Sequence, residues 1–277
     1  MIVNSRELLI NAKKNNRAIP QFNINNLEWT KYILEECNRN NYPVILGITE
    51  NVIKYMGGYT TIVNLIKSLD KDLNINIPVV IHLDHGKSYE VCKNAIDAGF
   101  TSIMIDGSLL PLADNIKLTK QVVDYAKKYD VPVEAELGCI GDLDNLTKVE
   151  DAIKFVSETN IDFLAPSIGN IHGIYKELPN IDIKRCQKIS NNVKIPLVLH
   201  GASGIDEQTL KNAIQNGISK ININTDLQIV WANDVRKYLN ENEKIYDPRK
   251  IISSGEKAIK EIVTKKINIL KNEDKCV

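Results

Sequence analysis

Three of the four histidines in this 277-residue chain are followed directly by glycine, and each of these pairs closes an apolar, strand-like run. The three are His85, His172 and His200. Neutral imidazole is a common zinc ligand, and a site with three protein ligands leaves a fourth position for water or substrate. A glycine beside each ligand lets the backbone come close to whatever the metal holds. The pattern predicts a catalytic metal site; the alternative is three unrelated histidines in turns.

Carboxylates also stand at the ends of the strand-like runs, at Asp84, Asp106 and Glu136. Three imidazoles and three carboxylates together suit a divalent metal with an acid or base beside it. We expect a functional role for Asp84, because an acid at the end of an apolar strand is costly to bury unless it is hydrogen-bonded, metal-linked or functional. On an extended strand His82 shares a face with Asp84 and opposes His85, so we expect a structural role for it, or a hydrogen bond to a site residue.

Eight short apolar stretches, several of them entered by a proline, are typical of buried strands, and amphipathic segments separate them. Eight strands that alternate with helices predict a closed (β/α)8 TIM barrel. An open, doubly wound sheet is the alternative, weakened because no glycine-rich dinucleotide fingerprint follows the first strand. The predicted strands are Ala18–Ile24, Pro43–Thr49, Pro78–His85, Ser102–Asp106, Pro132–Leu137, Asp162–Ile168, Pro196–His200 and Lys220–Thr225.

No linker rich in Pro, Gly or Ser divides the chain, so we expect one domain over residues 1–277, with an additional C-terminal helix from Gly255 to Leu270 and a polar tail over 271–277.

Basic and acidic residues balance at 35 each, without a basic stripe, which argues against nucleic acid as a partner. No export signal is visible, and the apolar runs are far shorter than the roughly 20 residues that span a bilayer. Five scattered cysteines without a CxxC pair fit a reducing compartment. We therefore expect a cytoplasmic protein with no membrane partner.

The carboxyl ends of barrel strands share one face, which builds the active site in this fold. The predicted metal ligands and carboxylates all stand at such ends, so residues remote in sequence are expected to meet at one mouth. Two later segments, Gly201–Gly204 and Asn222–Thr225, follow the seventh strand and end the eighth, each with a helix after it. Loops at these positions often bind phosphate through backbone N–H groups and a helix N-terminus. They predict a phosphorylated substrate, unless they serve only to turn the chain.

Five motifs at or near the predicted strand ends follow one another in a set order along the chain. They are His82-Leu83-Asp84-His85-Gly86, Glu134-Ala135-Glu136-Leu137-Gly138, Gly169-Asn170-Ile171-His172-Gly173-Ile174-Tyr175-Lys176, His200-Gly201-Ala202-Ser203-Gly204 and Asn222-Ile223-Asn224-Thr225. Together they resemble the motifs of the class II, metal-dependent ketose-bisphosphate aldolases. The resemblance runs from Gln21 to Lys250 and is closest to the fructose-bisphosphate branch, with tagatose-bisphosphate aldolases as near relatives.

The resemblance implies one catalytic zinc ion on the three histidines that precede glycine. Asp84 is then the group that moves the proton of the sugar C4 hydroxyl. Asp106 and Glu136 match positions that hold a second or displaced divalent ion in relatives.

The resemblance also implies how a phosphorylated sugar is held. Thr49 and Arg249 match positions that meet the distal phosphate. In relatives the arginine can come from a neighbouring subunit, which implies a homodimer or homotetramer. The positions around the dihydroxyacetone-phosphate half of the substrate and its monovalent cation, Na⁺ or K⁺, are Gly173, Lys176, Gly201, Ser203, Asn222 and Thr225.

The implied reaction is the reversible cleavage of fructose 1,6-bisphosphate into dihydroxyacetone phosphate and glyceraldehyde 3-phosphate, a step of glycolysis and gluconeogenesis. Breaking the C3–C4 bond leaves negative charge on an enediolate, and zinc bound to its oxygens stabilises that charge as a Lewis acid. No Schiff-base lysine is then required. The alternatives are tagatose 1,6-bisphosphate or a phosphorylated deoxy-keto acid as substrate, and a phosphosugar-binding protein with little catalysis.

The stretch after the fifth predicted strand departs from the family pattern. Relatives carry a long loop with a Gly-Gly-x-Glu-Asp type run, whose glutamate handles the proton at C3 of dihydroxyacetone phosphate. Here the corresponding segment, 141–147, is shorter and lacks the glutamate. Our hypothesis is that Asp144, which aligns with that position, or the nearby Asp142 takes its place. Leu109 and Leu110 also replace a more polar pair of many relatives, and these departures put the substrate in question more than the reaction class.

Overall fold

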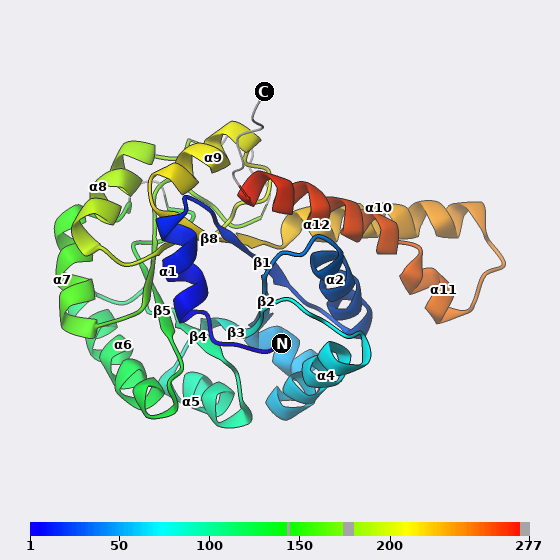
Figure 1. The fold of residues 1–277 in the computed structure, drawn as a ribbon, viewed down its shortest axis with the longest axis horizontal. Helices are drawn as coiled ribbons and strands as arrows, with labels where there is room; N and C mark the ends of the chain where they lie inside the picture. The colour runs from blue at the N-terminus through cyan, green and yellow to red at the C-terminus, as the bar shows by residue number, and fades with distance from the viewer. Residues whose placement is uncertain (143–144, 174–179, 272–277) are drawn as a thin grey trace.

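Eight parallel strands close into a barrel in this computed structural model, which describes residues 1–142, 145–173 and 180–271 (Figure 1). Each strand pairs with the next in sequence, and β1 pairs with β8 to complete the ring. The closed ring confirms the predicted (β/α)8 TIM barrel and excludes the open sheet. The strands are β1 (Ile19–Asn23), β2 (Val44–Thr49), β3 (Val79–Gly86), β4 (Ser102–Ile105), β5 (Val133–Leu137), β6 (Phe163–Pro166), β7 (Leu197–Leu199) and β8 (Ile218–Ile223).

All eight predicted strands are present, but two of their predicted ends are wrong in ways that matter for the site. The eighth strand ends at Ile223, so Thr225 begins a helix instead of closing a strand. The sixth strand ends at Pro166, and Gly169, with φ of +95°, turns the chain that follows. His172 therefore reaches the mouth of the barrel from a loop and not from the end of a strand.

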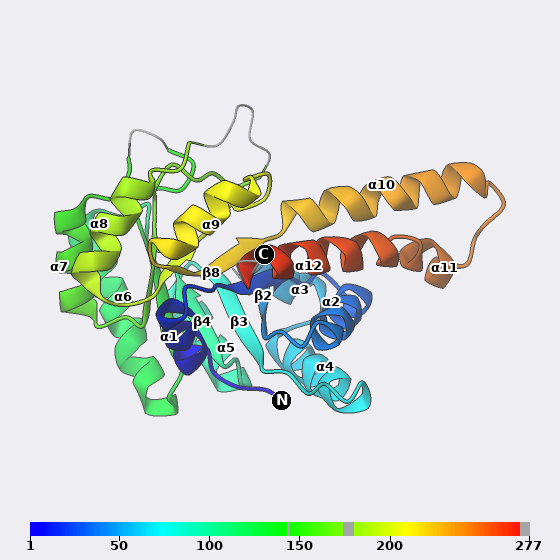
Figure 2. The ribbon, with the colours of Figure 1, turned by 45° about the horizontal axis from the view of Figure 1, so that its top comes forward.

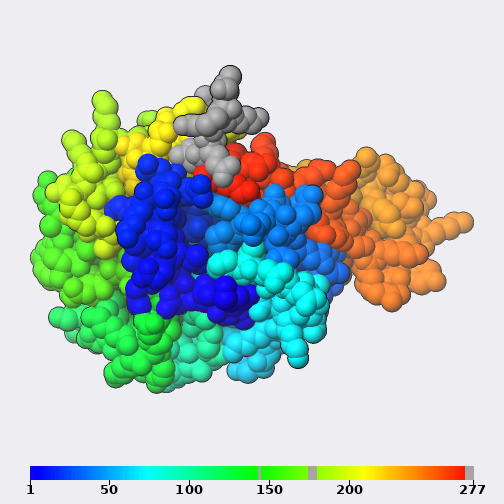
Figure 3. Space-filling model, viewed as in Figure 1, coloured from blue at the N-terminus to red at the C-terminus, as the bar shows by residue number. Residues whose placement is uncertain are grey.

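Helices form the outer layer, and none in the described residues is long and apolar enough to cross a membrane. The first, α1 (Arg6–Lys14), packs against β1 and β8 and covers the amino-terminal end of the barrel (Figure 1). The space-filling view shows the N-terminal residues covering this face (Figure 3). The other helices are α2 (Leu27–Arg39), α3 (Glu50–Tyr55), α4 (Tyr59–Asp72), α5 (Tyr89–Ala98), α6 (Leu112–Ala126), the short η1 (Lys127–Tyr129), α7 (Val149–Thr159), α8 (Ile183–Val193), α9 (Glu207–Gln215), α10 (Thr225–Glu241), α11 (Pro248–Ser253) and α12 (Glu256–Leu270).

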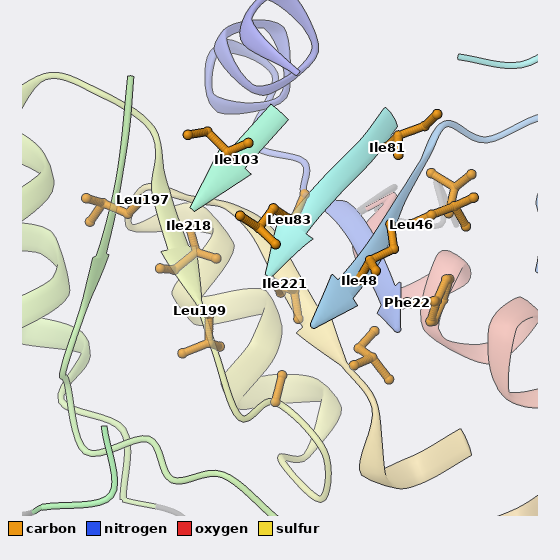
Figure 4. Close-up of a cluster of buried hydrophobic side chains, with 14 of the residues drawn as sticks. Phe22, Leu46, Ile48, Ile81, Leu83, Ile103, Leu197, Leu199, Ile218 and Ile221 are labelled. Carbon is orange, nitrogen blue, oxygen red and sulfur yellow. The ribbon is translucent and has the colours of Figure 1, made fainter. Parts of the chain in front are cut away.

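Alternation along the strands divides the barrel into an outer apolar layer and a narrow interior. The outward residues pack under the helices, as Phe22, Leu46, Ile81 and Leu83 do in Figure 4. The inward residues form layers. The layer nearest α1 is apolar and consists of Ile19, Ile45, Val80, Phe163, Ala165 and Val198, closed by Leu9 and Ala12 of α1. Toward the carboxyl end of the strands the inward positions become polar. The apolar residues near α1 and those beneath the helices therefore surround these polar positions.

Helices α10, α11 and α12 form an arm that projects to one side of the barrel (Figure 2). The helix predicted from Gly255 to Leu270 is confirmed as α12, which begins at Glu256. It packs against α2 and α10 and buries Ile259, Val263 and Ile267. The ring centroids of Trp29 and Trp231 lie 6.0 Å apart in an edge-to-face arrangement, and this contact joins α10 to α2 at the base of the arm.

Candidate active site

The three histidines that precede glycine meet at the carboxyl end of the barrel. Their ring centroids lie 4.7 Å apart for His85 and His200, 5.0 Å for His85 and His172, and 5.9 Å for His172 and His200. They border a cavity of about 160 Å³. Its lining residues are Asn23, Thr49, Asp84, His85, His172, Gly173, His200, Gly201, Ser203, Asn222, Asn224 and Thr225.

A distortion of β3 brings His85 into this cavity beside Asp84. A regular strand would point the two adjacent side chains to opposite faces. Instead the register of β3 with β4 shifts between Leu83 and Gly86, and His85 adopts a φ of +53°, so its ring turns toward the interior. His85 Nε2 then lies 4.0 Å from Asp84 Oδ1. The expectation that His85 opposes His82 across an extended strand is wrong for this reason.

Two of the glycines are required by close contacts inside the protein. A Cβ on Gly201 would lie 1.9 Å from the carbonyl oxygen of Ile171, so glycine lets the loop that carries His172 pass directly over the end of β7. Asn170 holds the same loop, because its Nδ2 donates to the carbonyl of His200 at 3.0 Å. A Cβ on Gly86 would be 2.8 Å from the carbonyl oxygen of Met104. By contrast, a Cβ on Gly173 would meet no neighbour within 4 Å among the described residues.

The protonation of the three imidazoles differs because their neighbours differ. Burial lowers the pKa of His85, but the charges of Asp84 and Asp106 and a hydrogen bond from its Nδ1 to Asp106 Oδ2 at 2.9 Å raise it to about 9. Burial and the two neighbouring rings lower the pKa of His172 to about 4. Burial also lowers the pKa of His200. Without a metal, His85 is therefore the cationic ring of the three.

Asp84 is held as an anion at the floor of the cavity. Burial alone would raise the pKa of its carboxyl, but the charges of His85, His200 and Lys220 keep that pKa well below its usual range. Two amides from β1 and β8 orient it: Asn23 Nδ2 donates to Oδ2 at 2.8 Å and Asn222 Nδ2 to Oδ1 at 3.3 Å. The carboxylate can accept a proton from a substrate hydroxyl placed near the three rings.

Asp106 and Glu136 stand behind His85 and complete a second group of possible ligands with it. Asp106 Oδ1 accepts hydrogen bonds from the backbone N–H and hydroxyl of Ser108, while Oδ2 accepts from His85 and from Lys87 Nζ. Burial and the charge of Asp106 raise the pKa of Glu136 to about 7. Its buried Oε2 has no hydrogen-bond partner among the described residues.

The two segments after β7 and at the end of β8 meet at the N-terminus of α10. Ser203 Oγ accepts from the backbone N–H of Asp226 at 3.1 Å, which ties the glycine-rich turn to the first turn of the helix. Asn224, at the N-cap, makes no side-chain hydrogen bond to the helix. The first backbone N–H groups of a long helix, close to a polar cavity, form a site suited to an anion.

The comparisons with known proteins agree with this geometry. The family model for the class II fructose-bisphosphate aldolases matches residues 3–275. The chain belongs to this family. Fructose-bisphosphate aldolases of Staphylococcus aureus and Geobacillus stearothermophilus are each 47% identical to it over 274 residues, covering 96% of both chains. The structure resembles that of the YdjI aldolase from Escherichia coli K12, with a TM-score of 0.87, 32% identity and full coverage of both chains. The protein is thus a class II aldolase, a lyase that acts on carbon–carbon bonds.

Not every residue predicted for the site lies in the cavity of the aldolase. Asp144 and Lys176 lie outside the described residues. Arg249 sits on α11 in the projecting arm, with 89% of its side chain exposed and an ion pair to Asp247 at 2.9 Å. It does not line the cavity of its own chain. Thr49 does line it, and its Oγ1 also caps α3 by accepting from Val52 N–H.

Sequence reasoning gave no role to Asn23, Glu134 or Lys220, of which the first two contact site residues directly and the third contacts Glu134. Asn23 donates to Asp84, Glu134 accepts from His200, and Lys220 pairs with Glu134 at 2.6 Å. A signal for Glu134 and Lys220 was present, because ionisable residues at inward positions of apolar strands are costly unless paired. Their partners, however, lie far away in sequence.

The raised pKa of His85 predicts that metal binding releases a proton. Below about pH 9 this ring is protonated in the metal-free aldolase, and it must lose that proton to become a ligand. We expect the release of about one proton per ion at about pH 7.5, falling toward zero as the pH rises beyond the pKa. Calorimetry measures the number of protons released when the heat of Mn²⁺ binding is compared between buffers of different ionisation enthalpy. The ionisation of Mn²⁺-bound water adds little to that number. A binding heat independent of the buffer at about pH 7.5 would contradict it.

Proposed function

We propose that this aldolase reversibly cleaves fructose 1,6-bisphosphate into dihydroxyacetone phosphate and glyceraldehyde 3-phosphate, using a zinc ion held by His85, His172 and His200. The observation that carries the proposal is the convergence of three imidazoles and one ionised aspartate on a single cavity. The 47% identity to chains named fructose-bisphosphate aldolase supports this substrate. The scattered free cysteines support a cytoplasmic location.

The donor set fits a divalent ion such as zinc. His85 Nε2 and His200 Nδ1 face each other at 3.1 Å, and the rings of all three histidines border the same space. Three nitrogen ligands with an open fourth position are the usual arrangement of a catalytic zinc site. When bound, the ion supplies Lewis-acid stabilisation of the negative charge that develops on the substrate oxygens.

The residues of the chain supply the proton transfer. Asp84 takes the proton of the C4 hydroxyl as the C3–C4 bond breaks, and returns it in the direction of synthesis. Its carboxylate suits this role, because it is ionised, oriented by Asn23 and Asn222, and 4.0 Å from the ring of His85. Asp144 or Asp142 takes the second role, at C3 of dihydroxyacetone phosphate.

The phosphate of the dihydroxyacetone-phosphate half binds at the N-terminus of α10, between the segments after β7 and β8. Backbone N–H groups supply the hydrogen-bond donors, and the same segments would hold a monovalent cation, Na⁺ or K⁺, whose charge would offset that of the phosphate. Two features of the described residues support this placement. The space beside Gly173 is open, and Oδ1 of Asn222 has no hydrogen-bond partner. The residues assigned to this half are Gly173, Lys176, Gly201, Ser203, Asn222 and Thr225.

We assign one catalytic ion to each chain and treat Asp106 and Glu136 as the place of a displaced ion. The side-chain ammonium of Lys87 already contacts Asp106 Oδ2. His85 cannot serve both groups at once, because a neutral imidazole keeps a proton on one of its two nitrogens. His85, Asp106 and Glu136 would hold a divalent ion only if Lys87 withdrew from Asp106 and His85 left the first group.

The distal phosphate is held by Thr49 and by Arg249 of a neighbouring subunit, so the working enzyme is a homodimer or homotetramer. The position of Arg249 on α11 supports this assignment, because the side chain is exposed and does not line the cavity of its own chain. The planar guanidinium suits a phosphate through paired hydrogen bonds.

Zinc-dependent cleavage is the first test. Purified aldolase should cleave fructose 1,6-bisphosphate, lose activity on chelation and regain it with zinc, and Asp84→Asn should lower kcat about 10²-fold to 10⁴-fold because it removes the proton acceptor. Asp97→Asn, which removes an exposed carboxylate on α5, is the control and should leave kcat unchanged. Faster turnover of tagatose 1,6-bisphosphate or of a phosphorylated deoxy-keto acid would reassign the substrate. Tight binding of all three without cleavage would contradict an aldolase role.

The loop aspartates can be tested by proton exchange, separately from bond cleavage. Replacement of both Asp142 and Asp144 by alanine should slow exchange of the C3 proton of dihydroxyacetone phosphate with solvent by about 10²-fold or more. The exchange is followed by NMR in deuterium oxide with zinc-loaded protein. Asp151→Ala, which removes a partly exposed carboxylate in the first turn of α7, is the control. Unchanged exchange in the double variant would show that neither aspartate replaces the glutamate of relatives.

Mixing two impaired variants tests the shared site. Arg249→Ala should raise KM for fructose 1,6-bisphosphate about 10-fold to 100-fold, the loss expected for hydrogen bonds to a charged group. When Arg249→Ala chains are refolded together with Asp84→Asn chains, mixed assemblies should contain sites with both an intact Asp84 and an intact arginine. Activity at low substrate concentration should therefore exceed the sum of the two variants. Activity equal to that sum would place Arg249 outside the site of its neighbour.

A further inference from the structure

A chain of buried polar side chains runs from the metal site through the middle of the barrel. Glu134, Lys220 and His82 are each at most 1% exposed. They belong to β5, β8 and β3, which are not neighbours in the ring, so they meet only through the barrel interior. Interiors of this fold are usually filled by bulky apolar side chains. Charges buried there are costly unless every one is paired and hydrogen-bonded.

Each link of this chain is within hydrogen-bond distance. His200 Nε2 lies 2.8 Å from Glu134 Oε1, and Glu134 Oε2 lies 2.6 Å from Lys220 Nζ. Lys220 Nζ lies 3.3 Å from His82 Nε2, and His82 Nδ1 lies 2.8 Å from Ser102 Oγ. The far end is attached to the helix that covers the barrel, because Ser5, just before α1, donates to Ser102 at 2.9 Å.

The hydrogen-bond donors and acceptors along this row of buried side chains are compatible with only one arrangement of protons. An ammonium group donates and never accepts, so His82 Nε2 is the acceptor and its proton lies on Nδ1, facing Ser102. Burial and the charge of Lys220 keep this ring neutral by lowering the pKa of His82 to about 3. Lys220 also holds Glu134 as a carboxylate, which only accepts. His200 must therefore carry its proton on Nε2.

The other nitrogen of His200 is then unprotonated and faces the site. His200 Nδ1 lies 3.1 Å from His85 Nε2. The Nδ2 group of Asn222 lies 3.3 Å from both ring nitrogens of His200, so this amide does not distinguish the two tautomers. A lone pair at this position is what a metal ligand must offer.

We propose that Glu134 and Lys220 are positioning residues, which hold His200 in the one tautomer that presents Nδ1 to a divalent ion. Glu134 accepts the hydrogen bond from the protonated Nε2 of His200 and fixes the plane of the ring. Lys220 neutralises the charge of Glu134 and contacts His82 in turn, so the buried pair is both charge-balanced and hydrogen-bonded. This inference rests on the proposed metal site at the three histidines.

The test removes the ion pair as a unit. The double variant Glu134→Leu/Lys220→Met leaves neither a buried lone charge nor a large cavity, because apolar residues of similar size often replace buried ion pairs at little cost in stability. The matched control is Glu35→Leu/Lys260→Met, which removes a half-buried ion pair between α2 and α12, away from the cavity. Zinc affinity is measured by competition with a chromophoric chelator, and the tautomer of His200 by ¹⁵N NMR of the metal-free protein.

We expect wild type and control to show the Nε2–H tautomer of His200 and equal zinc affinity. The double variant should show a mixture of tautomers and bind zinc about 10-fold to 100-fold more weakly, the loss typical of removing a partner of a ligating histidine. Wild-type affinity in a folded double variant would overturn the inference alone. An Nδ1–H tautomer in the wild type would overturn it even if the double variant fails to fold. Wild-type protein that binds no divalent ion would overturn the proposed metal site, and the inference with it.

Discussion

Alternation of side chains in a closed ring of parallel strands is the constraint on which the rest of this aldolase depends. Each strand sends every second residue outward to an apolar layer beneath the helices, and the others into a narrow interior. An inward residue cannot shift along its strand without exposing the outward ones. The position of Asp84, Glu134 or His200 is therefore set by the burial of its apolar neighbours in sequence, and a polar site is held by hydrophobic packing.

Charge balance inside that ring sets the chemistry. The carboxylates of Asp84 and Asp106 raise the pKa of His85 to about 9, and His85 in turn helps to keep the pKa of Asp84 well below its usual range. Deeper in the barrel, Lys220 lowers the pKa of Glu134 to about 2 against the opposing effect of burial. In the metal-free protein the charged groups of the site thus pair with one another. At the proposed metal site, a divalent ion would take the place of a proton in an arrangement that the protein has already formed.

Much of the fold and part of the site could be predicted because they follow from residue patterns within short segments of the sequence. Apolar runs of strand length, eight times repeated, identified the barrel, and the position of polar residues at strand ends placed Asp84, Asp106 and Glu136 at one mouth. The unusual φ of His85 could not be predicted, since it depends on a register shift between β3 and β4. Nor could the contact that requires glycine at position 201, because its partner is the carbonyl of Ile171 in another loop.

The sequence by itself determined the class of fold, the family and the set of residues able to bind a metal and move a proton, because periodicity and residue type are properties of short segments. Only the tertiary structure decided that His85 Nε2 and His200 Nδ1 face each other, and which acid pairs with which base. It also decided that Glu134 contacts His200 and Lys220 inside the barrel and that Arg249 does not line the cavity of its own chain. The physical reason is that pairing between ionisable groups depends on distances across the barrel and on burial, and neither is encoded in the spacing of residues along the chain.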